Sequence, residues 1–201
     1  MASTKQKITS VARSLFAVKG YEGTSMGDIA GGVGINKASL YSHYEGKDQL
    51  FLAVYREAAS DYERLNQALF EESNELPTGE RLFWIFRGYI LYYHRNTEFA
   101  ALWTQIVLFP PPHLREEVIA DLTLRDRFFH EELIKLFAIA IEEGIVRKDS
   151  PARLVMSFRS MRDGLLTWMH TVPQIKEEWI RSFWSDLWFG LQSRSVHDQG
   201  G

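Results

Sequence analysis

The first apolar stripe of the chain follows the spacing of one face of a helix. Its members, at i, i+3, i+4, i+7 and i+8, are Ile8, Val11, Ala12, Leu15 and Phe16. We expect this helix to end at Gly20, because glycine tolerates the left-handed backbone that closes many helices. A second helix is predicted after Thr24 or Ser25, whose side-chain oxygens can cap its free amides, and Gly34 breaks it.

The next segment, GINKASLYSHY over residues 34–44, has few apolar positions and many polar ones. Asn36 can cap a short third helix that runs through Tyr44. Lys47-Asp48 opens a fourth helix, whose apolar positions continue to about residue 72. The third helix is too short and too polar to contribute much to a hydrophobic core, so we expect its polar side chains to face outwards.

The remainder of the chain also shows helical periodicity, interrupted by proline and glycine. We predict five further helices, over residues 81–94, 99–109, 114–143 and 151–170 and from Pro173 to about residue 193. No stretch alternates apolar and polar residues as a strand does, and no internal repeat occurs. The chain is therefore predicted to be all-α, with about nine helices.

The composition is that of an ordinary globular protein, with 45% apolar and 24% charged residues among 201. The absence of cysteine excludes a disulfide framework and a thiolate metal site. The N-terminal residues lack the apolar core of a signal peptide, and no run approaches the ~18 apolar residues of a membrane span. We therefore expect a cytoplasmic protein without membrane association.

The net charge of −3 is distributed unevenly along the chain. Residues 1–50 carry six basic and four acidic side chains, so their charge is +2 and the remainder carries −5. A mildly basic head on an acidic body suggests that the head is the part that meets a polyanion.

The second and third helices and the glycine turn between them form a helix-turn-helix pattern, in which a short exposed helix can enter the major groove of DNA. Asn36, Lys37 and Ser39 lie in the first turn of that helix, where side chains reach base edges or phosphates. Tyr41 and His43 can donate hydrogen bonds to phosphate oxygens. The pattern therefore predicts double-stranded DNA as a partner.

Lys47 stands at the start of the fourth helix, where its charge and the free backbone amides can hold a further phosphate. We assign DNA contact to eight residues: Thr24, Ser25, Asn36, Lys37, Ser39, Tyr41, His43 and Lys47. For any one of them solvated surface is the alternative, and Tyr41 could also pack against the first helix. Two helices and a turn are common in helical proteins.

Residues 24–51, TSMGDIAGGVGINKASLYSHYEGKDQLF, resemble the DNA-binding signature of the tetracycline-repressor (TetR/AcrR) family. The positions that match are Thr24, Asp28-Ile29-Ala30, Gly34, Leu40-Tyr41, Lys47 and Leu50. Ile35, Ala38-Ser39, Tyr44 and Asp48 replace the valine, glycine-threonine, phenylalanine and glutamate of the family pattern. The resemblance is strong over residues 8–55 and extends to the rest only in length and helical build. It implies a dimeric transcriptional repressor that a small molecule releases from its operator.

Gly31-Gly32 departs from the family pattern, which has helix-favouring residues there. A glycine inside a helix costs roughly 1 kcal/mol relative to alanine. We expect Gly32 to permit close packing of the second helix. Gly31 has no such reason in the sequence, so Gly31→Ala is predicted to stabilise the head.

The middle of the chain is rich in aromatic side chains. For any single one core packing is the alternative, but together they exceed what a compact bundle needs, and apolar pockets with a few polar groups are the usual small-molecule sites. The family resemblance implies a pocket between the long middle helices, and we expect a hydrophobic or aromatic effector there. Tyrosine hydroxyls, Gln105, His130 and Arg162 could orient it. The residues assigned to effector binding are Trp84, Tyr89, Tyr92, Phe99, Trp103, Phe128 and Trp168.

The last two helices carry broad apolar stripes that predict assembly. Two copies pairing about a two-fold axis would form a four-helix interface and place two recognition helices about 34–36 Å apart or somewhat more. The residues assigned to this homodimer interface are Phe158, Leu165, Ile180, Phe183, Trp184 and Leu187. The alternative is that both stripes are buried within one chain.

We expect no enzymatic activity, no cofactor and no metal. The run HEEL at His130 lacks the second histidine of a zinc protease, because Ile134 stands in its place. The sequence also lacks a phosphate-binding glycine loop and a nucleophile elbow.

We divide the chain into a helix-turn-helix DNA-binding domain, residues 1–47, a ligand-binding and dimerisation domain, residues 48–195, and a disordered tail, residues 196–201. The fourth helix joins the two domains. The predicted function is a homodimeric repressor that binds a palindromic operator and is released by its effector. Two alternatives stay open: a ligand-independent regulator or activator of the same fold, and a helical small-molecule-binding protein without DNA binding.

Overall fold

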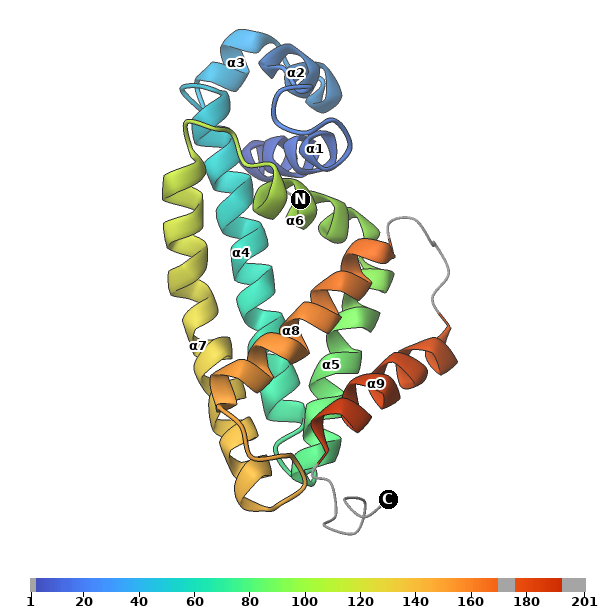
Figure 1. Cartoon of the computed structure of the whole chain (residues 1–201). Helices are drawn as coiled ribbons and strands as arrows, with labels where there is room; N and C mark the ends of the chain where they lie inside the picture. Colours follow the sequence, from blue (N-terminus) through green and yellow to red (C-terminus); the bar gives the residue numbers. More distant parts are fainter. Residues whose placement is uncertain (1–2, 170–175, 193–201) are drawn as a thin grey trace. The chain divides into compact units, whose positions relative to one another are not determined.

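The computed structural model describes residues 3–169 and 176–192 (Figure 1). In these ranges nine helices form the regular structure, with one isolated bridge between Val146 and Gln192. The helices are α1 (Thr4–Lys19), α2 (Met26–Val33), α3 (Lys37–Tyr41), α4 (Lys47–Glu72), α5 (Thr78–Arg95), α6 (Thr97–Leu108), α7 (Arg115–Glu142), α8 (Pro151–Trp168) and α9 (Glu177–Leu191). The predicted all-α fold is confirmed for this part of the chain. The predicted tail, 196–201, and the helix start expected after Pro173 lie outside the described residues.

Polar side chains cap α2 and α3 as the sequence suggested. The Ser25 hydroxyl accepts a hydrogen bond from the Asp28 amide at 3.1 Å, and the Ser25 amide donates to the Asp28 carboxylate at 2.9 Å. The Asn36 side chain accepts from the Ser39 amide at 2.8 Å. These bonds satisfy amides that the first turn of a helix leaves free, which explains why both helices begin where they do.

Glycine closes α1 and α2. Gly20 has φ +67° and Gly34 has φ +78°, both in the region that side chains disfavour. The third helix is shorter than expected, because it ends at Tyr41 rather than near Tyr44. The turn that follows brings Tyr44 into the core, where it is buried.

The chain forms two compact units. The first contains Met1–Arg64 and Asn96–Arg125, and the second contains Leu65–Arg95 and Asp126–Gly201. Helices α4 and α7 each contribute residues to both units. These units are the parts of the chain within which residues contact one another most densely. The division into a DNA-binding domain and a ligand-binding domain, with bounds at residues 47 and 195, stays a prediction.

In the first unit, α1 packs against α2 and α6, and α2 packs against α3 (Figure 1). Its core consists of fully buried apolar side chains from α1, α2, α3 and α4, namely Ile8, Phe16, Ile29, Leu40 and Leu50. The small helical head is therefore held together by a few large side chains.

In the second unit, α5 packs against α8 and α9 (Figure 1). The largest side chains of its core are aromatic and fully buried: Phe86, Tyr89, Phe129, Phe137 and Phe158. Phe158 meets Phe86 and Phe137 with ring centroids 5.7 and 5.9 Å apart. Much of the aromatic content of the chain thus packs this core.

The two glycines of α2 have different surroundings. A Cβ added at Gly32 would lie 2.7 Å from Cγ1 of Val11 on α1, whereas one added at Gly31 would meet nothing within 4 Å. Gly32 therefore permits the close approach of α1 and α2, as the sequence led us to expect. Gly31 has no packing reason.

Candidate nucleic-acid interface

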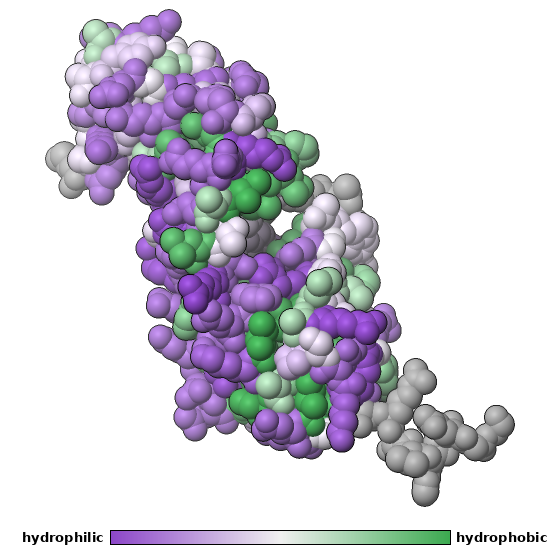
Figure 2. All heavy atoms as spheres, turned by 60° about the vertical axis from the view of Figure 1, so that its left-hand side comes forward, coloured by the Kyte–Doolittle hydropathy of each residue, from purple (hydrophilic) through white to green (hydrophobic). Residues whose placement is uncertain are grey.

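The short helix α3 is anchored by one side chain and exposes most of the others. Leu40 is fully buried, while Lys37, Tyr41 and His43 are exposed and Ser39 is partly exposed. In Figure 2 the part of the surface at the top of the view is covered mainly by hydrophilic and near-neutral residues. The helix therefore presents a polar surface that the core of its unit does not use.

Lys37 lies across the start of α2. Its Cε would be 2.9 Å from a Cβ placed on Gly27, so the end of this side chain lies close over that glycine. The hydrogen bonds from Ser25 hold the pKa of the Asp28 carboxyl below its usual range, and the charges of Lys19 and Lys37 lower it further. Lys37 thus lies on the exposed side of the junction between the two helices.

Thr24 and Ser25 are adjacent but face different surroundings. Thr24 is 1% exposed, and its hydroxyl donates to the Gly20 carbonyl at 2.8 Å. Ser25 is exposed at the cap of α2. The Thr24 hydroxyl therefore stabilises the loop between α1 and α2, and its assignment to DNA contact stays a prediction.

Lys47 holds the same loop from the start of α4. Its ammonium group donates to the Tyr21 carbonyl at 2.9 Å and lies 3.9 Å from the centroid of the Tyr21 ring. The charge of Lys47 is therefore directed at the loop, and the amides in the first turn of α4 remain the groups of this region that can face a phosphate.

A polar cluster beside Lys47 was not predicted. The Tyr21 hydroxyl donates to Asp48, whose other carboxylate oxygen lies 3.1 Å from Nε2 of His113. The hydrogen bond from Tyr21, with a contribution from His113, keeps the pKa of Asp48 below its usual range. His113 is 65 residues away from Asp48 along the chain, so no local pattern could have revealed the contact.

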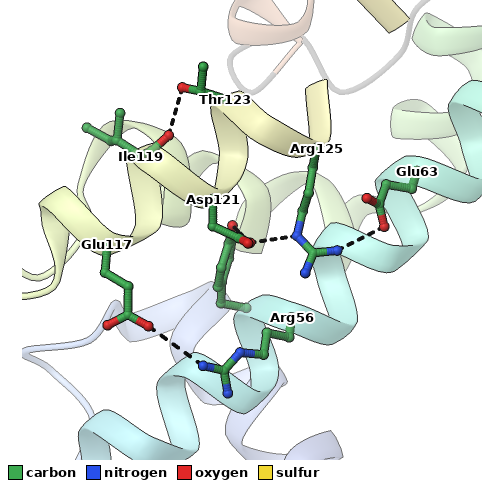
Figure 3. Close-up of polar contacts among 8 residues, drawn as sticks. Arg56, Glu63, Glu117, Ile119, Asp121, Thr123 and Arg125 are labelled. Atoms are coloured by element: carbon green, nitrogen blue, oxygen red, sulfur yellow. Dashed lines mark hydrogen bonds and ion pairs between the residues drawn. The ribbon is translucent and has the colours of Figure 1, made fainter. Parts of the chain in front are cut away.

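A second polar network joins α4 to the beginning of α7 within the first unit (Figure 3). The buried Tyr55 hydroxyl donates to Asp121 at 2.5 Å, and burial is the largest cause that raises the pKa of Tyr55. Arg125 bridges Asp121 at 2.6 Å and Glu63 at 2.9 Å. Arg56 and Glu117 form an exposed outer pair at 3.6 Å.

The residues assigned to effector binding fall into both units. In the first, Phe99 and Trp103 stack with centroids 5.6 Å apart, and Trp103 also stacks on Tyr62 at 4.8 Å. In the second, Tyr89 is fully buried, with the Arg162 guanidinium 4.3 Å from its ring centroid. The remaining four are partly or largely exposed: Trp84, Tyr92, Phe128 and Trp168. Which of these line a pocket stays a prediction.

Most residues assigned to the dimer interface are buried inside the second unit. Phe158, Leu165, Ile180 and Leu187 are buried there, whereas Phe183 and Trp184 are partly exposed. Helices α8 and α9 leave other apolar side chains exposed, above all Met156 at 67% and Phe189 at 71%. The assigned stripes thus hold the helices of one unit together, and the pairing of two copies stays a prediction.

In residues 3–169 and 176–192, no group of three or more histidine, aspartate and glutamate side chains is arranged to hold a metal ion. In the same ranges, no helix combines the length and the apolar character that a membrane crossing requires.

The head of the chain matches a known family. The model for bacterial regulatory proteins of the tetR family matches residues 8–54. IcaR of Staphylococcus epidermidis, the negative transcriptional regulator of the biofilm operon icaADBC, is 49% identical over 47 residues. Those residues are 23% of this chain and 25% of IcaR, so the chain covers about a quarter of the length of the curated relatives that it matches.

Solved structures of the same fold extend the likeness to the whole chain. The TetR family transcriptional regulator PfmR from Thermus thermophilus is 26% identical, with a TM-score of 0.71 over 97% of this chain and 100% of PfmR. AibR, solved in complex with isovaleryl coenzyme A and operator DNA, is 23% identical, with a TM-score of 0.70 over 96% of this chain and 100% of AibR. The head of the chain, residues 8–54, therefore matches the tetR family of bacterial regulatory proteins, and the whole chain has the fold of solved TetR family transcriptional regulators.

Proposed function

We propose that the protein is a homodimeric transcriptional repressor that binds a palindromic operator through α3 and leaves it when an apolar or aromatic effector binds. The observation that carries the proposal is the construction of α3. Leu40 alone anchors the helix, while Lys37, Tyr41 and His43 are exposed. A short polar helix with one anchor has the form that enters a major groove.

Each exposed group has a role that its chemistry suits. Asn36 and Ser39 form the cap of α3, and Lys37 beside them supplies the charge that attracts phosphate. Tyr41 at the end of α3 and His43 in the turn after it can donate hydrogen bonds to phosphate oxygens. Lys47 positions the loop between α1 and α2 through Tyr21, and the amides of α4 then face a second phosphate.

Relatives support repression and small-molecule binding at the level of the family. IcaR is named as a negative regulator, and AibR was solved with operator DNA and isovaleryl coenzyme A together. The chain itself offers a DNA-binding head and an aromatic second unit. Operator binding places its action in the cytoplasm, where bacterial DNA lies.

Helix α4 is the element through which effector and operator would affect each other. It begins at the head and contributes its last residues to the second unit. The network of Tyr55, Asp121 and Arg125 fixes α4 to the start of α7, so a displacement of either helix is passed to the other (Figure 3). A coupling of about 1–3 kcal/mol would weaken operator binding roughly 5–150-fold.

Pairing of two copies is supported by the apolar side chains that α8 and α9 leave exposed. Met156 and Phe189 are each about two-thirds exposed, and Trp168 is 40% exposed. A two-fold axis beside these helices would cover all three and form a four-helix interface. Sedimentation equilibrium of the full chain and of Met156→Asp, Phe189→Asp tests this: the double variant should be monomeric.

The proposal is tested by selecting duplex fragments from a random pool with the purified full chain. We expect an enriched inverted repeat with half-sites about 10 base pairs apart or somewhat more, because a two-fold protein reads a palindrome. Absence of enrichment would support a helical binding protein without DNA binding. An enriched site that raises transcription of a reporter would support an activator, and release that no small molecule affects would support a ligand-independent regulator.

A further inference from the structure

The second unit contains an open cavity of about 900 Å³ at the start of α5, the end of α7 and one side of α9. Three aromatic rings line it, from Phe83, Trp184 and Trp188. Three charged side chains also line it, from Glu80, Glu143 and Arg181. None of the residues assigned to the effector contributes to this cavity, so it is separate from the predicted effector site, although Trp184 is among the residues assigned to the dimer interface.

The aromatic wall is preformed. Trp184 and Trp188 stack with centroids 5.2 Å apart and planes 21° apart, and Phe83 meets Trp184 at 5.6 Å. All three rings are partly exposed, so each keeps a surface that a bound molecule could cover. Gly79 lies against Trp188, where a Cβ would be 3.4 Å from the indole, and thus adds no side chain that would fill the cavity.

The charges around the cavity favour a cation over an anion. The carboxylates of Glu80 and Glu143 are exposed at the cavity. The Arg181 guanidinium opposes them, but it already lies 3.7 Å from the Glu177 carboxylate and 5.4 Å from the centroid of the Phe83 ring. The cavity therefore has an excess of negative charge.

The backbone adds to that excess. Glu143 and Gly144 follow the last turn of α7, and Gln192 follows the last turn of α9. The carbonyl groups at the C-terminal end of a helix carry partial negative charge, which favours cations nearby. The start of α5 also lies at the cavity and opposes this effect, and the Arg147 guanidinium already donates to the Gly190 carbonyl at the end of α9, so the end of α7 supplies the negative helix end.

We propose that this cavity binds a small organic cation that carries a flat aromatic ring. The ring would stack on the exposed indole surfaces of Trp184 and Trp188, and the ammonium group would face Glu80 and Glu143. Indole is the aromatic side chain that attracts cations most strongly, and the attraction acts within about 6 Å of the ring centroid. The Arg181 guanidinium remains beside the Glu177 carboxylate and the Phe83 ring, and its positive charge repels the ammonium group from that side of the cavity.

The test uses two probes with the same ring and opposite charge, 1-naphthylmethylammonium and 1-naphthylacetate. Each is titrated into the full chain labelled with nitrogen-15 at tryptophan, and the indole signals are followed by NMR, with Trp184→Phe and Trp188→Phe identifying their own signals. We expect the cation to shift the signals of Trp184 and Trp188 first and to reach half-saturation below about 1 mM. Tighter binding of naphthylacetate, or shifts that appear first at other indoles, would overturn the proposal.

Variants of the two exposed carboxylates distinguish binding of the cation at this cavity from its general attraction to an acidic protein. Glu80→Gln, Glu143→Gln should weaken binding of the cation about three- to tenfold, because both charges at the cavity are lost while the rings stay. Glu75→Gln, Glu142→Gln is the matched control: it removes two exposed carboxylates that do not line the cavity, and should leave the affinity unchanged. Equal losses in the two variants would show that net charge, and not this site, holds the probe.

Discussion

The head and the second unit of this chain place their polar side chains differently. The head, residues 8–54, keeps a small apolar core and turns polar groups outwards from a short helix and the turn after it, such as Lys37 and His43. The second unit instead buries large aromatic rings and even one charged side chain, Arg162, which is 3% exposed. The head is 49% identical to IcaR over 47 residues, whereas the whole chain shares 26% identity with PfmR.

The head and the second unit differ in what constrains their sequences, and this difference explains the contrast in identity. A helix that enters the major groove must fit its dimensions. The length of that helix, the turn before it and the buried side chain that anchors it are therefore constrained. An apolar core needs only the right volume and periodicity, which many sequences supply. We infer that the head is constrained by the shape of its partner and the second unit by its own packing.

The largest expected effect comes from removing the anchor of α3. Leu40→Ala should destabilise the head by about 2–5 kcal/mol, because a fully buried side chain leaves a cavity when it is shortened. Operator binding should be lost with the helix. Five of the six tryptophans lie in the second unit and only Trp103 lies in the first, so urea unfolding followed by circular dichroism should begin before most of the tryptophan fluorescence changes.

Phe158→Ala is the matched change in the second unit. It removes a fully buried ring and should cost about 3–5 kcal/mol, with an early loss of the tryptophan signal because Trp184 lies beside that ring. If Leu40→Ala instead shifted both signals together and equally, the head and the second unit would unfold as one, and the contrast between them would not extend to stability.

The next effect separates two adjacent glycines of the head. Gly32→Ala should destabilise by about 1–3 kcal/mol, because the new methyl group would lie 2.7 Å from Val11. Gly31→Ala should stabilise by about 1 kcal/mol, because alanine favours a helix and the position is open. Thermal unfolding of both variants beside the parent chain measures the two opposite shifts.

Operator affinity of Gly31→Ala provides the control for that comparison. Unchanged affinity would identify Gly31 as a position without a function in binding. A more stable head with weaker binding would show that the missing side chain makes room for DNA. An unchanged or lower melting temperature would contradict the open surroundings of Gly31.

The sequence was informative where a residue acts through its immediate neighbours. Ser25 and Asn36 cap helices because their side-chain oxygens reach amides three residues later. Gly34 ends α2 because glycine, which has no Cβ, readily adopts the left-handed backbone found there. Periodicity likewise predicted the helices, since one apolar face is enough to define each. These properties are local, and a single sequence contains them.

Contacts between distant segments could not be predicted in this way. Asp48 and His113 meet across 65 residues, and Tyr55 reaches Asp121 across 66. Nor could the sequence tell that Phe158 and Ile180 are buried within one unit, because an apolar stripe on a helix can be covered by the same chain or by a second copy. Which stripe of an apolar helix is covered depends on its neighbours, and that information is not local.

A smaller effect concerns the charge of one exposed lysine in the head and of one in the second unit. Lys37→Ala should weaken operator binding and lower the magnitude of the salt slope by about 1, because one phosphate contact is lost. Lys135→Ala is the counterpart in the second unit, where an exposed lysine pairs with Glu132 at 2.6 Å. It should change neither quantity. Fluorescence anisotropy of a labelled operator over a series of salt concentrations measures both variants.

The smallest effect is the response of the head to acid, which the cluster around Asp48 predicts. Its pKa is lower in the folded chain than in the unfolded chain, chiefly because Tyr21 donates to it. A carboxyl with a lowered pKa stabilises the fold above its unfolded value of about 3.9, and this contribution is lost as the pH falls through the folded pKa. Tyr21→Phe keeps the ring against Phe51 and removes the donor, so the acid-dependent loss of stability should become smaller. Urea unfolding of both proteins between about pH 6 and pH 2.5 compares them, and a difference that is constant over this range would mean that Asp48 does not stabilise the head through this bond.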